Sequence, residues 1–216
     1  MKLLLTSAGL TSDKIAEALV GLVGKPFSEI KVLFVTTAAN TSVEDKRWLT
    51  ENIFEFTNRK PLSFDILDIA GLPNVLWQKH FELADVICVG GGDESYLSKI
   101  FIEQGVKDYL VNSLDDRVYM GISAGSMVAG IFLPKGLNIE LYGEDCESDN
   151  GTGMRFFDFV FMPHLDSPYF PNITAEVIES KLDRFSSRVI AVDDFAAISL
   201  NHDKFDFVGD GLYLEY

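Results

Sequence analysis

Short apolar segments alternate with amphipathic segments over residues 2–120, and this alternation limits the possible folds more than any other feature. Lys31 to Thr36 is apolar throughout its middle, as expected of a strand buried on both faces. Strands that alternate with helices form a parallel sheet with helices on both sides. We therefore expect an α/β fold, a three-layer sandwich around a mainly parallel sheet. The predicted strands of this part are 2–6, 31–36, 63–67, 85–89 and 117–120.

Helical segments with an apolar face lie between these strands, and the pattern changes after Gly136. The predicted helices are 13–23, 42–57, 75–81, 94–104 and 105–112. Beyond Gly136 we expect a loop or hairpin at 138–153, a strand at 156–162, a helix at 173–185, strands at 189–193 and 197–200, and a terminal hairpin at 204–216. The sequence shows no internal repeat and no linker, so residues 1–216 are expected to form one domain.

The charge of the chain excludes several classes of partner. Its formal net charge is −15 over 216 residues. Such a charge opposes binding to nucleic acid, which depends on neutralising phosphates, and opposes docking on anionic lipid. No apolar run approaches the length of a membrane span, and the short run at 3–5 predicts a buried first strand rather than a secretory leader. We therefore expect a cytoplasmic protein with neither nucleic-acid nor membrane partners.

The two cysteines, Cys88 and Cys146, lack the spacing of a metal site. Cys88 lies within the predicted strand 85–89, where a buried free thiol is expected. We expect no metal and no organic cofactor.

A Gly-x-Ser-x-Gly motif is centred on Ser123, between the β-forming segment 117–120 and the helix-compatible segment 126–131. Glycines on both sides of a serine allow a sharp strand-to-helix turn that exposes the hydroxyl. Such a turn also places the serine near a helix N-terminus, where it can be activated as a nucleophile. The alternative is an ordinary tight turn, since glycines form those as well.

A serine nucleophile needs a base, and the chain has three histidines. His80 follows a predicted helix end, and His202 lies in a predicted hairpin turn. His164 follows the apolar segment 156–162, so we expect it at the same edge of the sheet as Ser123. We predict that His164 is the base, the alternative being a capping residue.

Developing negative charge on a carbonyl oxygen requires hydrogen-bond donors. Gly90-Gly91-Gly92 follows the predicted strand 85–89, and its amides can turn toward a substrate. Ala124 offers a further N–H directly after the nucleophile. A phosphate-binding loop is the alternative, but the glycine spacing differs and two carboxylates, Asp93 and Glu94, follow directly.

Three segments together resemble the aspartyl dipeptidase (dipeptidase E) family of serine peptidases, to which cyanophycinases are similar: Val89-Gly90-Gly91-Gly92-Asp93, Met120-Gly121-Ile122-Ser123-Ala124-Gly125 and Met162-Pro163-His164. The resemblance implies a flavodoxin-type fold like that of class I glutamine amidotransferases. It implies Ser123 as nucleophile, His164 as base, and Gly91, Gly92 and Ala124 as oxyanion donors. The implied activity is hydrolysis of dipeptides or short peptides, with a preference for N-terminal aspartate. The sequence leaves a homodimer open.

Serine peptidases of this kind use a catalytic triad of serine, histidine and an acid. The chain departs from the family at the acid. The acid of dipeptidase E matches Asn138 here, which is neutral. We predict Glu140 instead, two residues on, with an ordinary solvent-facing role as the alternative; further candidates are Glu144, Asp145 and Asp158. A carboxylate fixes the histidine tautomer and stabilises the imidazolium, and a neutral asparagine lacks the charge for this stabilisation. The neutral residue motivates a rival hypothesis, a catalytically silent member of the fold that binds a small ligand or a protein.

The preference for aspartate also needs a cation in the site. Arg155 lies between Ser123 and His164 in sequence and is the candidate, with an exposed strand-start residue as the alternative.

Overall fold

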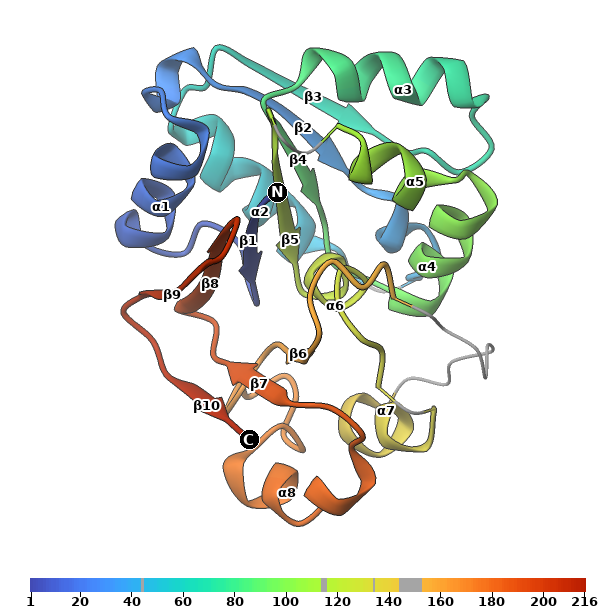
Figure 1. Ribbon diagram of the computed structural model, residues 1–216, viewed down its shortest axis with the longest axis vertical. Helices are drawn as coiled ribbons and strands as arrows, with labels where there is room; N and C mark the ends of the chain where they lie inside the picture. Colours follow the sequence, from blue (N-terminus) through green and yellow to red (C-terminus); the bar gives the residue numbers. More distant parts are fainter. Residues whose placement is uncertain (44, 114–115, 134, 144–152) are drawn as a thin grey trace.

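A seven-stranded sheet forms the centre of the computed structural model, which describes residues 1–43, 45–113, 116–133, 135–143 and 153–216 (Figure 1). Its strand order is β3-β2-β4-β5-β1-β8-β9. The first five strands in this order are parallel to their neighbours, and β8 and β9 extend the sheet by antiparallel pairing. The strands are β1 (Lys2–Thr6), β2 (Lys31–Val35), β3 (Ser63–Leu67), β4 (Val86–Val89), β5 (Val118–Ile122), β8 (Ala196–Asn201) and β9 (Lys204–Gly209).

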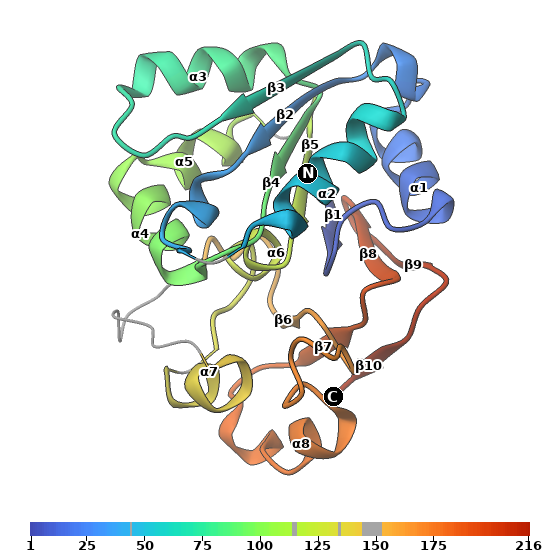
Figure 2. The ribbon, with the colours of Figure 1, turned by 180° about the vertical axis from the view of Figure 1, so that it is seen from behind.

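Helices cover both faces of this sheet because successive strand residues point to opposite sides. Leu3 and Leu5 of β1 pack into one core with α3, α4 and α5, whereas Leu4 packs into a second core with α1 and α2. Figure 2 shows α2 on the side of the sheet that faces the viewer. These helices are α1 (Asp13–Val23), α2 (Arg47–Asn58), α3 (Asn74–Leu83), α4 (Glu94–Glu103) and α5 (Val106–Val111). The predicted α/β fold with a mainly parallel sheet is thereby confirmed.

A smaller sheet of order β10-β7-β6 lies beyond the carboxyl ends of β1 and β5 (Figure 1). It consists of β6 (Val160–Met162), β7 (Val189–Val192) and β10 (Tyr213–Glu215). The predicted terminal hairpin at 204–216 is wrong, because β9 pairs with β8 and β10 pairs with β7 in the other sheet. The turn between them is fixed by Phe195 O, which accepts the N–H groups of Asp210 and Gly211.

Helix α2 begins at Arg47 and not at 42 as predicted, and three later segments also differ from the prediction. Of the predicted strand 156–162 only Val160–Met162 pairs, and the predicted helix 173–185 is divided into α8 (Ala175–Glu179) and the 3₁₀ helix η3 (Leu182–Arg184). Residues 135–142 form a helix, α7 (Lys135–Tyr142), where a loop or hairpin was expected from 138. Leu137 and Leu141 are spaced four apart and both are buried, which explains the helix. The remainder of the predicted loop, 144–152, lies outside the described residues.

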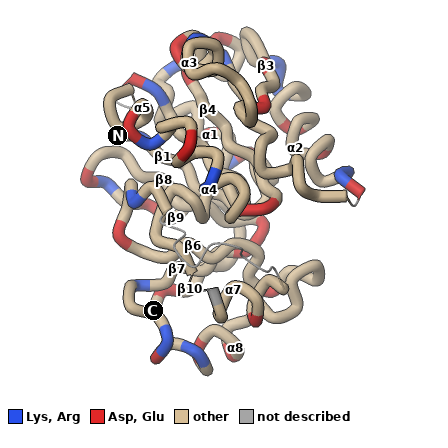
Figure 3. Tube along the Cα trace, turned by 90° about the vertical axis from the view of Figure 1, so that its right-hand side faces the viewer, with Lys and Arg blue, Asp and Glu red and all other residues tan. Residues whose placement is uncertain are grey.

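Acidic residues are spread over the molecule in the view of Figure 3, both around the large sheet and around the small one. The net charge of −15 is therefore not confined to a single element. Within the part of the chain that the structure describes, no helix combines the length and apolar character needed to cross a membrane.

Candidate active site

Ser123 occupies a strained turn between β5 and the short helix α6 (Ala124–Met127). Its φ of 49° and ψ of −115° lie in a region that non-glycine residues rarely adopt. The turn is held from both sides. The Ser123 N–H donates to Thr6 O at 3.0 Å, and the Ser123 carbonyl accepts the Ser126 and Met127 N–H groups at 2.8 and 3.0 Å.

Close contacts explain the two glycines of the motif. A Cβ on Gly121 would lie 2.5 Å from Ser126 N, and a Cβ on Gly125 would lie 2.0 Å from Val89 O. Both distances are far below van der Waals contact. The glycines therefore allow α6 to fold back tightly against β4 and β5, which fixes Ser123 at the carboxyl edge of the sheet.

The structure brings His164 to Ser123, with Nε2 and Oγ 2.9 Å apart. His164 follows β6 by one proline, and its φ of 68° is left-handed. Its ring stacks on Phe170 with 4.4 Å between centroids and 14° between planes. The backbone N–H of His164 donates to Ser7 Oγ at 3.1 Å. His164 is thus held at three points: one face of its ring, its backbone N–H and its Nε2 atom.

Asp194 provides the carboxylate for His164, with Oδ1 and Nδ1 2.6 Å apart. It follows β7 by one residue, in the turn that leads to β8. Burial by itself raises the pKa of Asp194, but the hydrogen bond and the charge of His164 outweigh it and hold that pKa below its usual value of 3.8. The two side chains are only 12% and 26% exposed, so this is a charge-assisted contact partly screened from water.

Glu140, the predicted acid, lies elsewhere. It is exposed on α7, where its carboxylate binds Lys181 Nζ at 2.5 Å and Arg184 Nη1 at 2.9 Å. Hydrogen bonds from Lys181 and then Arg184 lower the pKa of Glu140. The helical conformation of 135–142 points this side chain toward η3 and away from the sheet edge, so Glu140 joins two surface elements instead of orienting His164.

Neither of the other two candidates that the structure describes, Asn138 and Asp158, takes the place of Asp194. Asn138 is fully buried on α7, and Asp158 is exposed. Glu144 and Asp145 lie outside the described residues. A signal for Asp194 was present in the sequence, since Asp193-Asp194 directly follows the apolar segment 189–192 just as Pro163-His164 follows 156–162.

The glycine loop after β4 lies against the nucleophile. A Cβ on Gly91 would be 3.2 Å from Ser123 Cβ and 3.8 Å from its Oγ. Gly92 has a φ of +129°, and a Cβ there would lie 2.3 Å from Ala38 O. Among the described residues, the N–H groups of Gly91, Gly92 and Ala124 donate to no protein acceptor. These amides are therefore available to a ligand atom bound at Ser123.

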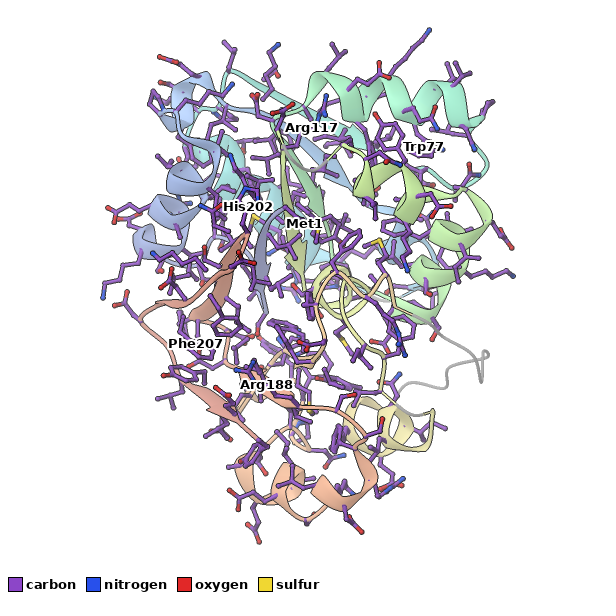
Figure 4. All side chains as sticks on the ribbon, viewed as in Figure 1. Met1, Trp77, Arg117, Arg188, His202 and Phe207 are labelled. Atoms are coloured by element: carbon purple, nitrogen blue, oxygen red, sulfur yellow. The ribbon has the colours of Figure 1, made fainter. Side chains whose placement is uncertain are left out.

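The remaining histidines are engaged away from this site. His80 Nδ1 lies 2.5 Å from Asp65 Oδ2, and His202 Nδ1 lies 3.1 Å from the amino terminus of Met1. Figure 4 shows His202 near Met1, which precedes β1, whereas Ser123 bonds to Thr6 at the other end of that strand. Cys88 is a buried free thiol, as expected, and burial raises its pKa. Cys146 lies outside the described residues, and the described ones contain no cluster of three His, Cys, Asp or Glu side chains that could hold a metal ion.

A cavity of about 300 Å³ lies at the far end of α6 from Ser123. Apolar side chains and two cations, Lys107 and Arg155, line it. Its other lining residues are Ser98, Phe101, Ile102, Val128, Gly153 and Met154.

Comparison with known proteins identifies the family. A sequence profile of peptidase family S51 matches residues 3–208. The chain belongs to peptidase family S51. It is a serine-type peptidase, and the resemblance to the dipeptidase E family is confirmed.

Solved structures share the fold of this S51 peptidase. A Listeria monocytogenes EGD-e protein provisionally assigned as a peptidase E aligns with a TM-score of 0.73 at 18% identity, covering 98% of each chain. A peptidase from an acI-B1 actinobacterium aligns with a TM-score of 0.67 at 18% identity, covering 99% of this chain and 93% of the other. A comparison with curated protein sequences gives no match.

Proposed function

We propose that this S51 peptidase hydrolyses dipeptides or short peptides through an acyl-enzyme formed on Ser123. The observation that carries the proposal is the continuous chain of contacts from Ser123 Oγ to His164 Nε2, at 2.9 Å, and from His164 Nδ1 to Asp194 Oδ1, at 2.6 Å. Nucleophile, base and orienting carboxylate in this order are the arrangement that acyl transfer by serine requires.

In the first step, Ser123 Oγ forms a bond to the carbonyl carbon while its proton passes to His164 Nε2. The carbonyl oxygen gains the negative charge. Three N–H groups supply donors for it: those of Gly91, which lies against Ser123, of the next residue Gly92, and of Ala124, which follows the nucleophile; among the described residues none of them donates to a protein acceptor. Asp194 keeps the proton on Nδ1 in the neutral ring and stabilises the imidazolium that forms.

In the second step, His164 returns the proton to the leaving amine as the carbon–nitrogen bond breaks. Water then attacks the acyl-enzyme, giving a proton to His164, and the collapse of the second tetrahedral intermediate returns that proton to Ser123 Oγ. No step requires a group beyond water and the residues named here.

For the amino-terminal residue of the substrate we propose aspartate, with Arg155 as the partner of its carboxylate. Arg155 and Lys107 line the cavity beside Val128, which follows Ser123 by five residues. At a rise of 1.5 Å per helical residue that separation is about 8 Å, which is comparable with the roughly 7 Å length of two extended residues. Neither cation has a carboxylate partner among the described residues, so both are available to an anionic side chain.

Labelling with a fluorophosphonate tests the nucleophile directly, because the probe reacts with an activated serine whatever the substrate is. The parent protein should react at Ser123, and Ser123→Ala should lose both labelling and peptide turnover while remaining folded. Ser180→Ala is the matched control, because Ser180 is exposed and its hydroxyl donates to Val177 O. A folded parent that resists labelling supports the rival hypothesis of a silent, ligand-binding member. A Ser123→Ala variant that cleaves peptides at the parent rate refutes the proposal.

A dipeptide panel that varies only the amino-terminal residue tests the preference. With Asp, Asn, Ala and Leu at that position, kcat/KM should be highest for Asp. Arg155→Met should remove this advantage and leave the Ala and Leu dipeptides unaffected. Arg47→Met is the charge-matched control, since Arg47 is exposed and pairs with Asp45. Equal losses for all four dipeptides, or a parent preference for Leu, contradict the aspartate assignment.

A further inference from the structure

We propose that Ser7 and Thr11, in the segment that follows β1, are positioning residues that hold His164 and Asp194 by their backbones in the reactive arrangement. The proposal rests on the proposed function, because positioning has meaning only if Ser123, His164 and Asp194 react as described above. It assigns to hydroxyl groups of the amino-terminal segment a role in aligning residues that are more than 150 positions away in sequence.

Ser7 links the histidine-bearing loop to the strand that precedes the aspartate. Its side chain is buried, with 1% of the residue exposed. Its Oγ accepts the N–H of His164 at 3.1 Å and donates to Val192 O, at the end of β7, at 2.9 Å. One hydroxyl therefore spans two elements of the small sheet region and ties both of them to β1.

Thr11 performs the matching task for Asp194. Its Oγ1 donates to the Asp194 carbonyl at 2.8 Å. Between Ser7 and Thr11 the chain turns at Gly9, whose φ is 94°. Thr6, the residue before Ser7, contacts the nucleophile in the same way, because its carbonyl accepts the backbone N–H of Ser123 at 3.0 Å. Residues 6–11 thus contact the backbone of the nucleophile, the base and the orienting acid.

The backbone of His164 needs such a restraint. Its φ of 68° is unfavourable for a residue with a side chain, and this conformation persists only where the surroundings fix it. Ser7 Oγ is the acceptor of the His164 N–H, so its removal leaves that group without its partner. Misplacement of a catalytic group by about 1 Å costs on the order of 10²-fold in rate. We therefore expect a loss in kcat and little change in KM.

The experiment compares Ser7→Ala and Thr11→Val with Ser12→Ala in the full-length protein. Ser12 is the matched control, since it neighbours Thr11 but its hydroxyl caps α1 by accepting the Ile15 N–H. Ser7→Ala and Thr11→Val should each lower kcat and the rate of fluorophosphonate labelling by about 10- to 100-fold, with KM unchanged within about threefold. Ser12→Ala should lower stability and leave kcat and labelling at the parent level. Ser7→Cys, which keeps a weak donor and acceptor of similar size, should recover part of the loss.

Two further readouts separate positioning from a general effect on structure. The proton between His164 Nδ1 and Asp194 Oδ1 should give a low-field NMR resonance, which its absence in Asp194→Asn would assign. Ser7→Ala and Thr11→Val should each shift or broaden this resonance. In an Asp194→Asn background, Thr11→Val should cause no additional loss of labelling, because coupled residues are not additive.

Unchanged kcat and an unchanged resonance in folded Ser7→Ala and Thr11→Val would overturn the proposal, as would an equal loss in Ser12→Ala. If Ser7→Ala does not fold, Thr11→Val decides alone. Failure of the proposed function looks different, since the parent itself would then resist labelling and cleave no peptide.

Discussion

Replacement of Asp194 by Asn tests the central contact of the site. Asparagine preserves the shape of the side chain and its hydrogen bond to Nδ1, but it removes the negative charge and can select the wrong tautomer of His164. The Nδ1–Oδ1 distance of 2.6 Å and the 12% and 26% exposures describe a short, charge-assisted hydrogen bond that water screens only in part. Its loss should therefore have its largest effect in the transition state, where the imidazolium forms.

We expect Asp194→Asn to lower kcat by about 10³- to 10⁴-fold, the loss that this substitution causes in a serine triad. At about 1.4 kcal/mol for each tenfold change, this is roughly 4 to 5.5 kcal/mol of transition-state stabilisation. KM should change little, because Asp194 does not touch the substrate. Glu140→Gln is the matched control and should keep kcat within about twofold, since exposed ion pairs contribute little.

The assay is single-turnover cleavage of a dipeptide together with the second-order rate of fluorophosphonate labelling of Ser123, both at neutral pH. Circular dichroism confirms that each variant is folded. If Asp194→Asn retains the parent rate while Glu140→Gln loses activity, the assignment of the acid is refuted and the sequence-based prediction of Glu140 stands. Equal losses in both variants would show that neither carboxylate acts specifically on His164.

Three further predictions follow from the same geometry. Phe170→Leu removes the ring stacked on His164 and should lower kcat about 3- to 10-fold. Stopped-flow turnover at saturating substrate would detect this loss. Phe170→Tyr, which keeps an aromatic ring, should largely retain the parent kcat. Gly91→Ala places a methyl group 3.2 Å from Ser123 Cβ and should reduce labelling about tenfold or more by displacing an oxyanion donor, whereas Gly21→Ala, with open space around its Cβ, should match the parent in the same assay. Because the pKa of Asp194 is lowered on folding, the ionised carboxylate stabilises the folded protein above the usual value of 3.8, and this stabilisation is lost as the pH falls through the lower folded pKa. Urea titrations should then show a stability difference between the parent and Asp194→Asn that narrows below about pH 4; a difference that widens there would contradict the assignment.

The sequence determined most strands of the large sheet and two residues of the candidate site. The strands predicted at 2–6 and 63–67 are found at those residues, and the strand predicted at 31–36 is found at Lys31–Val35. In the first and the last of these a continuous apolar run between helical segments leaves few alternatives. Ser123 and His164 were predicted to meet because each follows an apolar segment, and the two side chains do meet. The reason differs from the expected one, because β6 belongs to the small sheet, so the contact depends on how the two sheets pack and not on a shared edge of one parallel sheet. These inferences use only periodicity along the chain and the chemistry of glycine, serine and histidine.

Only the tertiary structure decided which carboxylate faces His164 and which groups hold it. Glu140 is closer in sequence to Ser123, but α7 directs it to Lys181 and Arg184, whereas Asp194 reaches Nδ1 through the turn between β7 and β8. The hydrophobic pattern along the sequence likewise did not indicate that the strands divide into two sheets, with β10 paired to β7. The physical reason is that strand pairing and side-chain contacts between distant segments depend on which surfaces meet after the chain has folded. The residues next to Asp194 or β10 in sequence therefore do not indicate which distant segment each one contacts.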